Sequence, residues 1–526
     1  MAQYEIAVTK PYLWFPVRIA AQKQYVEIFA NGAKCFEFDI PVKNDDNAPD
    51  FYGCLEVAPF IGQTFLLQAP VDESWFAQIR QEDSRPDRPA SPNRPLLHMT
   101  ANSGWINDPN GLVYHDGTYH LFFQHNPFDV AWGNMSWGHC VSKDLMHWTQ
   151  IDTALHPDSS GTMFSGSGLV DVQNALGYGQ NTLAFFYTAA GGSNPWSKGT
   201  LFTQHLAVST DEGRTLQKQG VAVPTIGPDS RDPKVFWHEV SQAYIMALWI
   251  EGNDYAILRS TDLRHWEQSQ RFTMPDAWEC PDLFCLPVYD AAGAAHGEKW
   301  VFWSAPGYYS VGNFDGYRYT PEESHSAYAR DGVQKDELSY AAQTYSNTPG
   351  RVINIAWLRP QNRGELFTGC MGIPREFSLI KTASGTILQH KPAKEFTDLL
   401  RADISFGLAA NDSRCCNAAE EPFVLDLSLN EQTSGKAEIE YNGFIISVNL
   451  GDGTVCANGR TFAFDKGAVC GAMDLQLIVD YKVVELTAAN HTLYTVMENT
   501  SHQLAGNITV RTEDCAATAG LSRVAL

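Results

Sequence analysis

The chain has 526 residues, of which 44% are hydrophobic and 12% aromatic, and its formal net charge is −23. A folded protein of this length is expected to divide into about two to four domains. The acidic charge argues against nucleic acid and anionic membrane surfaces as partners, and no run of about 18 apolar residues predicts a membrane span.

The 11 cysteines are scattered and odd in number. This pattern fits free thiols in a reducing compartment better than a disulfide framework. Cys280 and Cys285 are close in sequence, but no second Cys or His pair completes a zinc-ligand spacing, so no metal site is expected. The first residues lack the basic and apolar stretches of a signal peptide. We therefore predict a cytoplasmic location, with secretion as the alternative if a signal has been removed.

Residues 1–80 are predicted to form a small β-rich domain, with strands at 25–29 and 34–40. Packing against the rest of the chain is the default role, and a sugar-binding module, a cap over a site or a dimer contact are the alternatives. Residues 81–95, QEDSRPDRPASPNRP, are predicted to be a linker because Pro, Arg, Asp and Ser dominate them.

Residues 96–382 contain an internal repeat. Three stretches begin NDPNG, RDPKVF and ECPDLF, and in each a hydrophobic strand and a turn follow. Ser-x-Asp turns begin at Ser142, Ser209 and Ser260, which are 67 and 51 residues apart, and we take them as structural. Such periods are typical of four-stranded propeller blades, and the range has room for five. The prediction for 96–382 is a five-bladed β-propeller.

Residues 395–526 are predicted to form a β-sandwich, because short strand-like segments alternate with Gly, Asn and Asp. These segments lie at 423–429, 437–441, 444–450, 475–479 and 483–486. The predicted fold is therefore all-β: a five-bladed β-propeller followed by a C-terminal β-sandwich, with a small β-rich N-terminal domain. An oligomer formed through the N- or C-terminal β domain is left open.

Three acidic residues occupy nearly equivalent positions in the repeat. Asp108, Asp232 and Glu279 each lie one or two residues before a matched proline. The first strand of each propeller blade lines the central channel, so equivalent positions in different blades face one axis. A single Asp-Pro pair is usually only a turn. Three acids in one register predict a shared pocket.

Converging carboxyl groups suit glycoside hydrolysis, which needs one ionised and one protonated carboxyl group. The polar NDPNG loop is expected to keep Asp108 ionised, and Arg231 is expected to do the same for Asp232. Glu279 has the more apolar neighbours, which suits a proton donor, and a third carboxylate nearby raises such a donor's pKa.

At these residues the chain resembles glycoside hydrolase family 32, the invertase, inulinase and levanase group, over roughly residues 93–526. The segments that carry the resemblance include the nucleophile motif, where Ile106 replaces a common Met. They are GWINDPNG (104–111), FFQHNP (122–127), WG (132–133), FSGS (164–167), RDPKVF (231–236), ECPDLF (279–284) and IPREFSL (373–379).

The resemblance implies a retaining β-fructosidase with the propeller and sandwich fold and no metal or organic cofactor. Asp108 is implied as the nucleophile, Glu279 as the acid/base and Asp232 as the transition-state stabiliser. Retention implies that the nucleophile and the acid lie about 5–5.5 Å apart. The residues implied to hold the terminal fructose are Asn107, Gln124, Trp132, Phe164, Ser165, Arg231 and Trp357.

The expected substrates are fructans, fructo-oligosaccharides or sucrose, cut from the end of the chain. The loop 189–200 departs from the family pattern and is expected to border the subsites beyond the first fructose, where Trp196 either stacks on a sugar or packs in its loop. The alternatives are a fructosyltransferase of the same family, an inverting propeller glycosidase acting on arabinan or xylan, and a catalytically inactive binding propeller.

Overall fold

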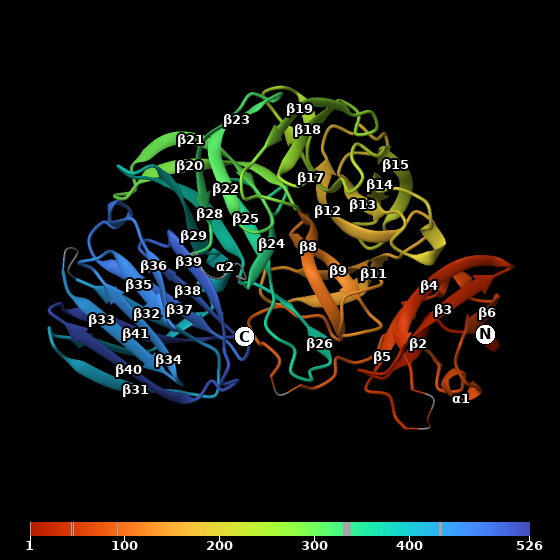
Figure 1. Cartoon of the computed structure of the whole chain (residues 1–526), viewed down its shortest axis with the longest axis horizontal. Coiled ribbons are helices and arrows are strands. Elements are labelled where there is room, and N and C mark those ends of the chain that lie inside the picture. The colour runs from red at the N-terminus through yellow and green to blue at the C-terminus, as the bar shows by residue number, and fades with distance from the viewer. Residues whose placement is uncertain (1, 44, 46, 92, 330–337, 431–433) are drawn as a thin grey trace.

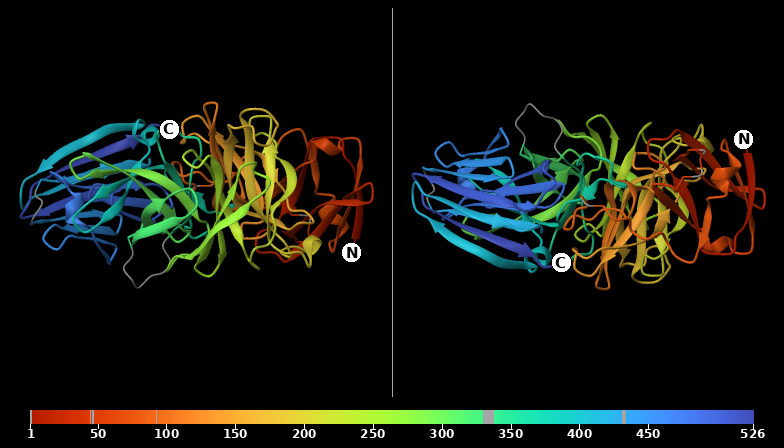
Figure 2. Two further views of the ribbon diagram at one scale, coloured as in Figure 1. Left: turned by 90° about the horizontal axis from the view of Figure 1, so that it is seen from above. Right: turned by 90° about the horizontal axis from the view of Figure 1, so that it is seen from below.

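The computed structural model describes the chain except for residues 1, 44, 46, 92, 330–337 and 431–433. Three β-rich parts lie in a row, with the N-terminal sheets at one end, the C-terminal sheets at the other and a ring of blades between them (Figures 1 and 2). Within the described residues, the only α-helices are the four-residue α1 (Glu73–Phe76) and α2 (Lys394–Thr397). No helix in this part of the chain has the length and apolarity needed to cross a bilayer.

The N-terminal part forms two antiparallel sheets around a core of its own. The sheets contain β1 (Ala2–Ala7), β6 (Thr64–Ala69), β3 (Lys23–Ala30) and β4 (Ala33–Pro41), and β5 (Phe51–Glu56), β2 (Tyr12–Val17) and β7 (Arg80–Glu82). Alternate residues of a strand face one side of its sheet. Val26 and Ile28 of β3 and Phe38 of β4 are accordingly buried, and Trp75 of α1 joins their core. A 3-10 turn, η1 (Ala58–Phe60), precedes β6.

The central ring has five blades, which confirms the propeller prediction. Blades 1 to 3 consist of β8 (Gly104–His115), β9 (Thr118–Asn126), β10 (Ser136–Ser142) and β11 (Thr149–Leu155); β12 (Thr162–Asp171), β13 (Thr182–Ala190), β14 (Thr203–Ser209) and β15 (Gln217–Val223); and β16 (Arg231–His238), β17 (Ala243–Glu251), β18 (Asp254–Ser260) and β19 (Glu267–Thr273). A 3-10 turn, η2 (Pro195–Ser197), interrupts the connection between β13 and β14.

Blades 4 and 5 are joined into one sheet, because β20 pairs with β28 in parallel. Blade 4 consists of β20 (Asp282–Asp290), β21 (Ala295–Trp303), β22 (Tyr308–Phe314) and β23 (Tyr319–Ser326), and blade 5 of β24 (Ser339–Thr344), β25 (Ile353–Leu358), β27 (Cys370–Met371), β28 (Arg375–Lys381) and β29 (Thr386–Pro392).

The ring closes between its last and first blades. The short strand β26 (Phe367–Thr368) pairs in parallel with the start of β8, where Phe367 lies opposite Gly104. Further along β8, the backbone amide of Tyr114 donates to the carbonyl of Ser346 at 3.0 Å. Residues far apart in the sequence thus seal the propeller.

The repeated Ser-x-Asp turns are structural, as predicted. Ser142, Ser209 and Ser260 end the third strands of blades 1 to 3. Each serine hydroxyl lies within hydrogen-bonding distance of the aspartate two residues later, at 3.0, 2.7 and 3.1 Å. These turns connect the third and fourth strands of their blades, and none of their residues lines the pocket described below.

The C-terminal part is a sandwich of two six-stranded antiparallel sheets, again as predicted. Their inner faces enclose one continuous apolar core. In order across each sheet, the strands are β30 (Leu400–Leu408), β41 (Ala517–Val524), β32 (Phe423–Leu429), β37 (Met473–Val479), β38 (Val483–Ala488) and β39 (Leu493–Glu498), and β31 (Ser413–Ala418), β40 (Gly506–Glu513), β33 (Lys436–Tyr441), β34 (Phe444–Asn449), β35 (Thr454–Ala457) and β36 (Arg460–Ala463). A 3-10 turn, η3 (Lys466–Ala468), precedes β37.

The segment predicted as a linker, 81–95, begins within β7 and then packs on the propeller. Arg94 is buried, donates to the carbonyl of Ala101 at 2.7 Å and lies 4.1 Å from the ring centroid of Phe367. The predicted domain limits 1–80, 81–95, 96–382 and 395–526 stay a prediction. All eleven cysteines are free, as expected for a reducing compartment, and the cytoplasmic location stays a prediction.

A buried charge cluster joins the propeller to the sandwich. The two ring nitrogens of His98 lie 2.9 Å from Asp480 and 3.0 Å from Glu485, and all three side chains are fully buried. Arg375 pairs with Glu485 from the other side. Burial alone lowers the pKa of His98, but the bonds to both carboxylates raise that pKa to about 9. Despite its burial, Glu485 has a pKa lowered to about 2 by Arg375 and His98.

These shifts define a pH window. The raised pKa of His98 gives stability that is complete below its ordinary value of 6.5 and is lost as the pH rises through about 9. The lowered pKa of Glu485 gives stability that is complete above its ordinary value of 4.5 and is lost as the pH falls through about 2. The cluster therefore stabilises the junction fully between about pH 4.5 and 6.5.

We expect His98→Ala to destabilise the protein by about 3–5 kcal/mol, because it leaves the buried Asp480 without its charged partner and Glu485 with Arg375 alone. The control His147→Ala removes a histidine that lies 2.7 Å from Asp144 with both side chains about half exposed, and such surface pairs contribute about 0–1 kcal/mol. Thermal unfolding at pH 6 measures both variants. Equal melting temperatures for the two variants would contradict a stabilising role for the cluster.

Candidate active site

One pocket of about 230 Å³ lies where the blades converge, and the three predicted acids line it together. All seven residues predicted to hold a sugar line it as well. One further lining residue, Tyr340 of β24, was not predicted. The full lining is Asn107, Asp108, Gln124, Trp132, Phe164, Ser165, Arg231, Asp232, Glu279, Tyr340 and Trp357.

Breaks in strand pairing place these side chains. The first strand of each of blades 1, 2 and 3 loses its register with the second strand near its start. The shifts fall between Ile106 and Pro109, Met163 and Gly166, and Arg231 and Lys234. A bulge of this kind bends the strand and re-aims the side chains within it. Asp108, Ser165 and Asp232 all lie inside such shifts.

The backbone at two of the acids has a conformation that L-residues rarely adopt. The φ angles are 66° at Asp232, 54° at Glu279 and 35° at Cys280. Left-handed backbone at residues other than Gly, Asn and Asp is uncommon, and it concentrates at functional sites, where the surrounding fold maintains it. Glu279 precedes β20 by three residues, so this turn, and not a strand, aims its side chain into the pocket.

Asp108 accepts three side-chain hydrogen bonds, the longest of them from the Cys280 thiol at 3.5 Å. Ser165 donates to its Oδ2 at 2.5 Å and Asn107 to its Oδ1 at 3.2 Å. Burial raises the pKa of Asp108, while these two donors work in the opposite direction and the charge of Glu279 adds to the rise. The net shift is upward, and the expectation that the NDPNG loop holds this carboxyl ionised stays a prediction.

Asp232 is almost fully buried beside Arg231. Its Oδ2 accepts the backbone N–H of Cys280 at 3.0 Å, and the Arg231 Nε lies 3.8 Å away. Burial raises the pKa of Asp232 to about 7, although the charge of Arg231 opposes that rise. The prediction that Arg231 keeps Asp232 ionised is therefore wrong for the free protein, because desolvation outweighs the neighbouring charge.

Arg231 makes its shorter contact with Glu279, across the pocket. Its Nη2 donates to Oε1 of Glu279 at 2.5 Å. The guanidinium also lies 4.0 Å from the ring centroid of Trp249, a cation–π contact that fixes its direction. The other oxygen of Glu279 accepts a hydrogen bond from the Tyr340 hydroxyl, and that hydroxyl accepts one from the Trp278 indole at 2.8 Å.

The Cys280 thiol lies between the two aspartates. Its sulfur is 3.5 Å from Asp108 Oδ2 and 3.6 Å from Asp232 Oδ2. Asp108 and Asp232 are therefore near neighbours, and Glu279 precedes the cysteine directly. The sequence-predicted separation of Asp108 and Glu279 stays a prediction.

Aromatic side chains form the rim of the pocket. Trp132 is 54% exposed, and its ring lies edge-on to Phe164 with centroids 6.3 Å apart. Trp357 lies opposite Tyr340, with centroids 6.3 Å apart. Gln124 is buried and donates to the carbonyl of Met163 at 2.8 Å. A polar floor with aromatic walls suits a ring that carries hydroxyls on its edge and C–H groups on its faces.

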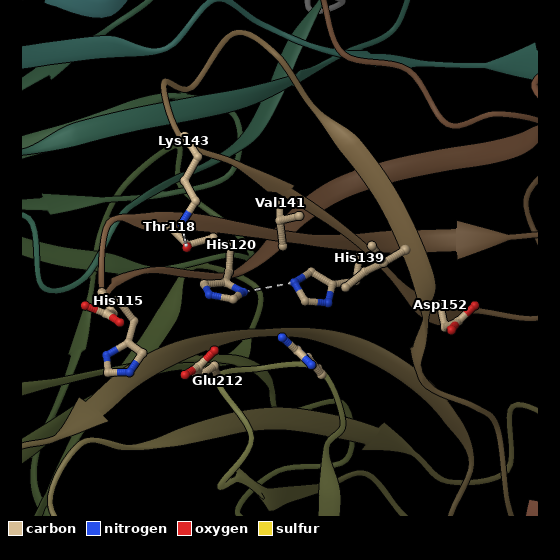
Figure 3. Close-up of a pocket in the computed structure, with 11 residues that line it drawn as sticks. His115, Thr118, His120, His139, Val141, Lys143, Asp152 and Glu212 are labelled. Carbon is tan, nitrogen blue, oxygen red and sulfur yellow. Dashed lines mark hydrogen bonds between the residues drawn. The ribbon is translucent and has the colours of Figure 1, made fainter.

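A second crevice, of about 480 Å³, lies between blades 1 and 2. Figure 3 shows His120 and His139 in its wall, with ring nitrogens 3.1 Å apart. Burial lowers the pKa of both, that of His120 to about 4. This crevice contains none of the three acids, so it is not the predicted site. Among the described residues, no three His, Cys, Asp or Glu side chains gather as a metal site requires.

Tyr340 was not predicted from the sequence because it lies in no recognisable motif. The repeat fades after residue 322, and the segment SYAAQT resembles an ordinary strand. One signal was available: a ring of five blades requires a fifth inner strand after blade 4. Its early positions are equivalent to those of the acids, and Tyr340 is the second residue of β24.

The chain matches the family model described as the glycosyl hydrolases family 32 N-terminal domain over residues 98–392. It is 34% identical over 331 residues to a levanase of Bacillus subtilis, a match that covers 57% of this chain and 47% of the levanase. It is also 31% identical over 397 residues to an extracellular exo-inulinase of Aspergillus awamori, covering 65% of this chain and 73% of that protein.

Two solved structures have the same fold. The crystal structure of the Aspergillus awamori exo-inulinase superposes with a TM-score of 0.72 at 24% identity, over 83% of this chain and 99% of that one. A glycoside hydrolase family 32 structure from Bifidobacterium adolescentis superposes with a TM-score of 0.67 at 18% identity, over 100% of this chain and 99% of that one. The second match therefore includes the N-terminal sheets.

Replacing Ser165 tests the electrostatics of the pocket. Ser165→Ala removes a hydrogen bond that lowers the pKa of Asp108, so that pKa is expected to rise and the acid limb of the pH profile of kcat/KM to move to higher pH. Ser167→Ala is the control, because Ser167 lies on the same strand and donates to the carbonyl of Pro233 instead. An acid limb that stays in place in Ser165→Ala would contradict this electrostatic account.

Proposed function

The chain belongs to glycosyl hydrolase family 32, and from that premise we propose that it removes terminal β-fructofuranosyl units from fructans, fructo-oligosaccharides or sucrose with retention of configuration. The observation that carries the proposal is the single pocket lined by three carboxyl groups from three different blades. The named levanase and exo-inulinase relatives support the substrate class.

In this proposal, Asp108 attacks the anomeric carbon of the terminal fructose while Glu279 gives its proton to the leaving oxygen. The glycosidic bond breaks and an ester between the fructosyl unit and Asp108 forms. Glu279, now ionised, takes a proton from water. The resulting nucleophile attacks the same carbon, fructose leaves and Asp108 is regenerated. Two inversions at one carbon give net retention.

The charges around the pocket support different roles for the three acids. Burial raises the pKa of Asp108 and of Asp232, so a positive charge that develops on the sugar favours the ionised form of both. Asp232 is then the stabiliser of the oxocarbenium-like transition state. Arg231 and Tyr340 hold the two oxygens of Glu279 and orient it as the acid/base.

The dimensions of the pocket support action at a chain end. A volume of about 230 Å³ is below the roughly 300–1,000 Å³ of sites for drug-sized ligands, so it suits one sugar ring. The polar residues Asn107, Gln124 and Ser165 reach that ring, and the exposed Trp132 lies at the rim. A terminal unit enters such a pocket more readily than an internal one.

We expect Asp108→Asn and Glu279→Gln each to lower kcat/KM for sucrose or inulin by about 10³-fold or more, because each removes a group that acts in the bond-breaking step. Released fructose is the readout, and circular dichroism verifies folding. Glu267→Gln is the control, since Glu267 is an exposed acid at the start of β19. Substantial activity in either pocket variant removes that residue from the mechanism.

Transfer to methanol tests retention. A covalent fructosyl intermediate can be captured by methanol in place of water, which gives methyl β-fructofuranoside, whereas an inverting enzyme forms no such intermediate. Proton NMR of the products formed from sucrose with added methanol identifies the glycoside and its anomer. Fructose as the only product at high methanol concentration would count against the double displacement. Oligosaccharides formed without methanol would indicate a fructosyltransferase.

A further inference from the structure

A hairpin of the N-terminal part reaches two propeller segments that border the pocket. We propose that this hairpin, β3–β4, is a specificity wall: it positions both segments and thereby sets how well the enzyme holds sugar units beyond the terminal fructose. The proposal rests on the proposed function, because it concerns the leaving-group side of the same site. Figure 1 shows β3 and β4 on the side of the N-terminal part that faces the ring.

The first segment, residues 127–134, carries Trp132 and is fixed to the hairpin on both sides of that residue. Before it, the buried Phe128 stacks on Phe38 of β4, with ring centroids 3.9 Å apart. After it, the Asn134 side chain donates to the carbonyl of Asp39 at 2.7 Å and accepts the amide of Asp39 at 2.8 Å. Trp132 is therefore presented between two anchors that belong to β4.

An ion pair adds a third anchor to this segment. Lys23, the first residue of β3, lies 2.9 Å from Asp129, whose side chain is only 6% exposed. A mostly buried carboxylate depends on its partner, so this contact also favours one conformation of the segment.

The second segment, residues 191–202, carries Trp196. The backbone amide of Trp196 donates to Glu37 of β4 at 3.0 Å. The ammonium group of Lys34 lies 5.4 Å from the centroid of the Trp196 ring and 2.9 Å from Glu37. Glu27 of β3 completes the cluster, 2.5 Å from Lys34. The side chains of Lys34 and Glu27 are each 17% exposed and that of Glu37 2%, so these contacts are far less screened than surface pairs.

The second segment continues directly into the wall of the pocket. The Ser193 hydroxyl lies 2.8 Å from that of Thr162, at the start of β12, two residues before Phe164. Phe202, at the end of the segment, packs edge-on against Phe164 with centroids 5.6 Å apart. Phe164 also contacts Trp132. An aromatic row of Trp132, Phe164 and Phe202 therefore runs along the rim between the two segments.

A pocket that holds one ring leaves the second and later sugar units against this rim. Aromatic rings hold sugars through the C–H groups of the sugar face, and the strength of such contacts depends on ring orientation. Lys34 and Asn134 are positioning residues in this scheme: they touch the segments that carry the rings. Loss of either loosens one segment, lowers affinity for longer chains and leaves the chemistry at Asp108 and Glu279 unchanged.

Two variants and two matched controls test the proposal. Asn134→Gly removes both bonds to Asp39 and keeps a backbone φ of 48° that glycine adopts freely. Asn31→Gly is its control: Asn31 has a φ of 50° in the turn of the same hairpin, and its side chain donates to Gln63. Lys34→Met removes the charge beneath Trp196. Its control, Lys43→Met, removes a 60% exposed lysine paired with Asp45.

The measurement is the ratio of kcat/KM for an inulin-type pentasaccharide to kcat/KM for an aryl β-fructofuranoside. We expect this ratio to fall about 3- to 10-fold through KM in Asn134→Gly and in Lys34→Met, and to stay at the wild-type value in both controls. Melting temperatures establish that all four variants are folded.

Two results overturn the inference alone. One is a wild-type ratio in both test variants, and the other is an equal loss on both substrates, which indicates a merely structural role. If the wild-type protein releases fructose from neither substrate, the proposed function fails and this inference fails with it.

Discussion

The site depends on one constraint: the inner strands of the blades must break their pairing where the reactive groups lie. In a regular ladder, alternate side chains point into the packed faces between blades. The register shifts around Asp108, Ser165 and Asp232 re-aim these residues toward the common axis. In blade 4 a left-handed turn at Glu279 has the same effect. Buried polar contacts below the pocket, such as Lys234 with Asp282 at 3.0 Å, then hold neighbouring blades in place.

Asp108 and Asp232 are buried in one small pocket, and burial raises the pKa of both. Arg231, the single arginine in the pocket, opposes this rise at Asp232. Arg231 lies closer to Glu279 than to Asp232, at 2.5 Å against 3.8 Å, and burial raises the pKa of Asp232 to about 7. In the proposed mechanism, the positive charge that develops on the sugar favours the ionised form of both aspartates.

Much of the fold and of the site could be predicted from the sequence, because the repeat shows which positions of different blades are equivalent. The motifs at 107, 231 and 279 predicted convergence, and the five-bladed ring follows from their spacing. The charge state of Asp232 was predicted wrongly because the sequence shows the neighbouring Arg231 but not the burial that raises the pKa of Asp232 to about 7. Tyr340 lies outside every motif. The contacts of Lys34 and Asn134 join segments about 100 or more residues apart, and single-sequence patterns contain no record of such pairs.

The seam between β26 and β8 has a consequence for biosynthesis. All three acids have been synthesised once residue 279 is made, yet the ring cannot close until Phe367 and Thr368 emerge and pair with Gly104 and Trp105, some 260 residues upstream. Contacts this distant in sequence form slowly, and until then the hydrophobic faces of the first blades lack their final neighbour. We therefore expect the nascent chain to stay inactive and exposed to aggregation until this last pairing forms.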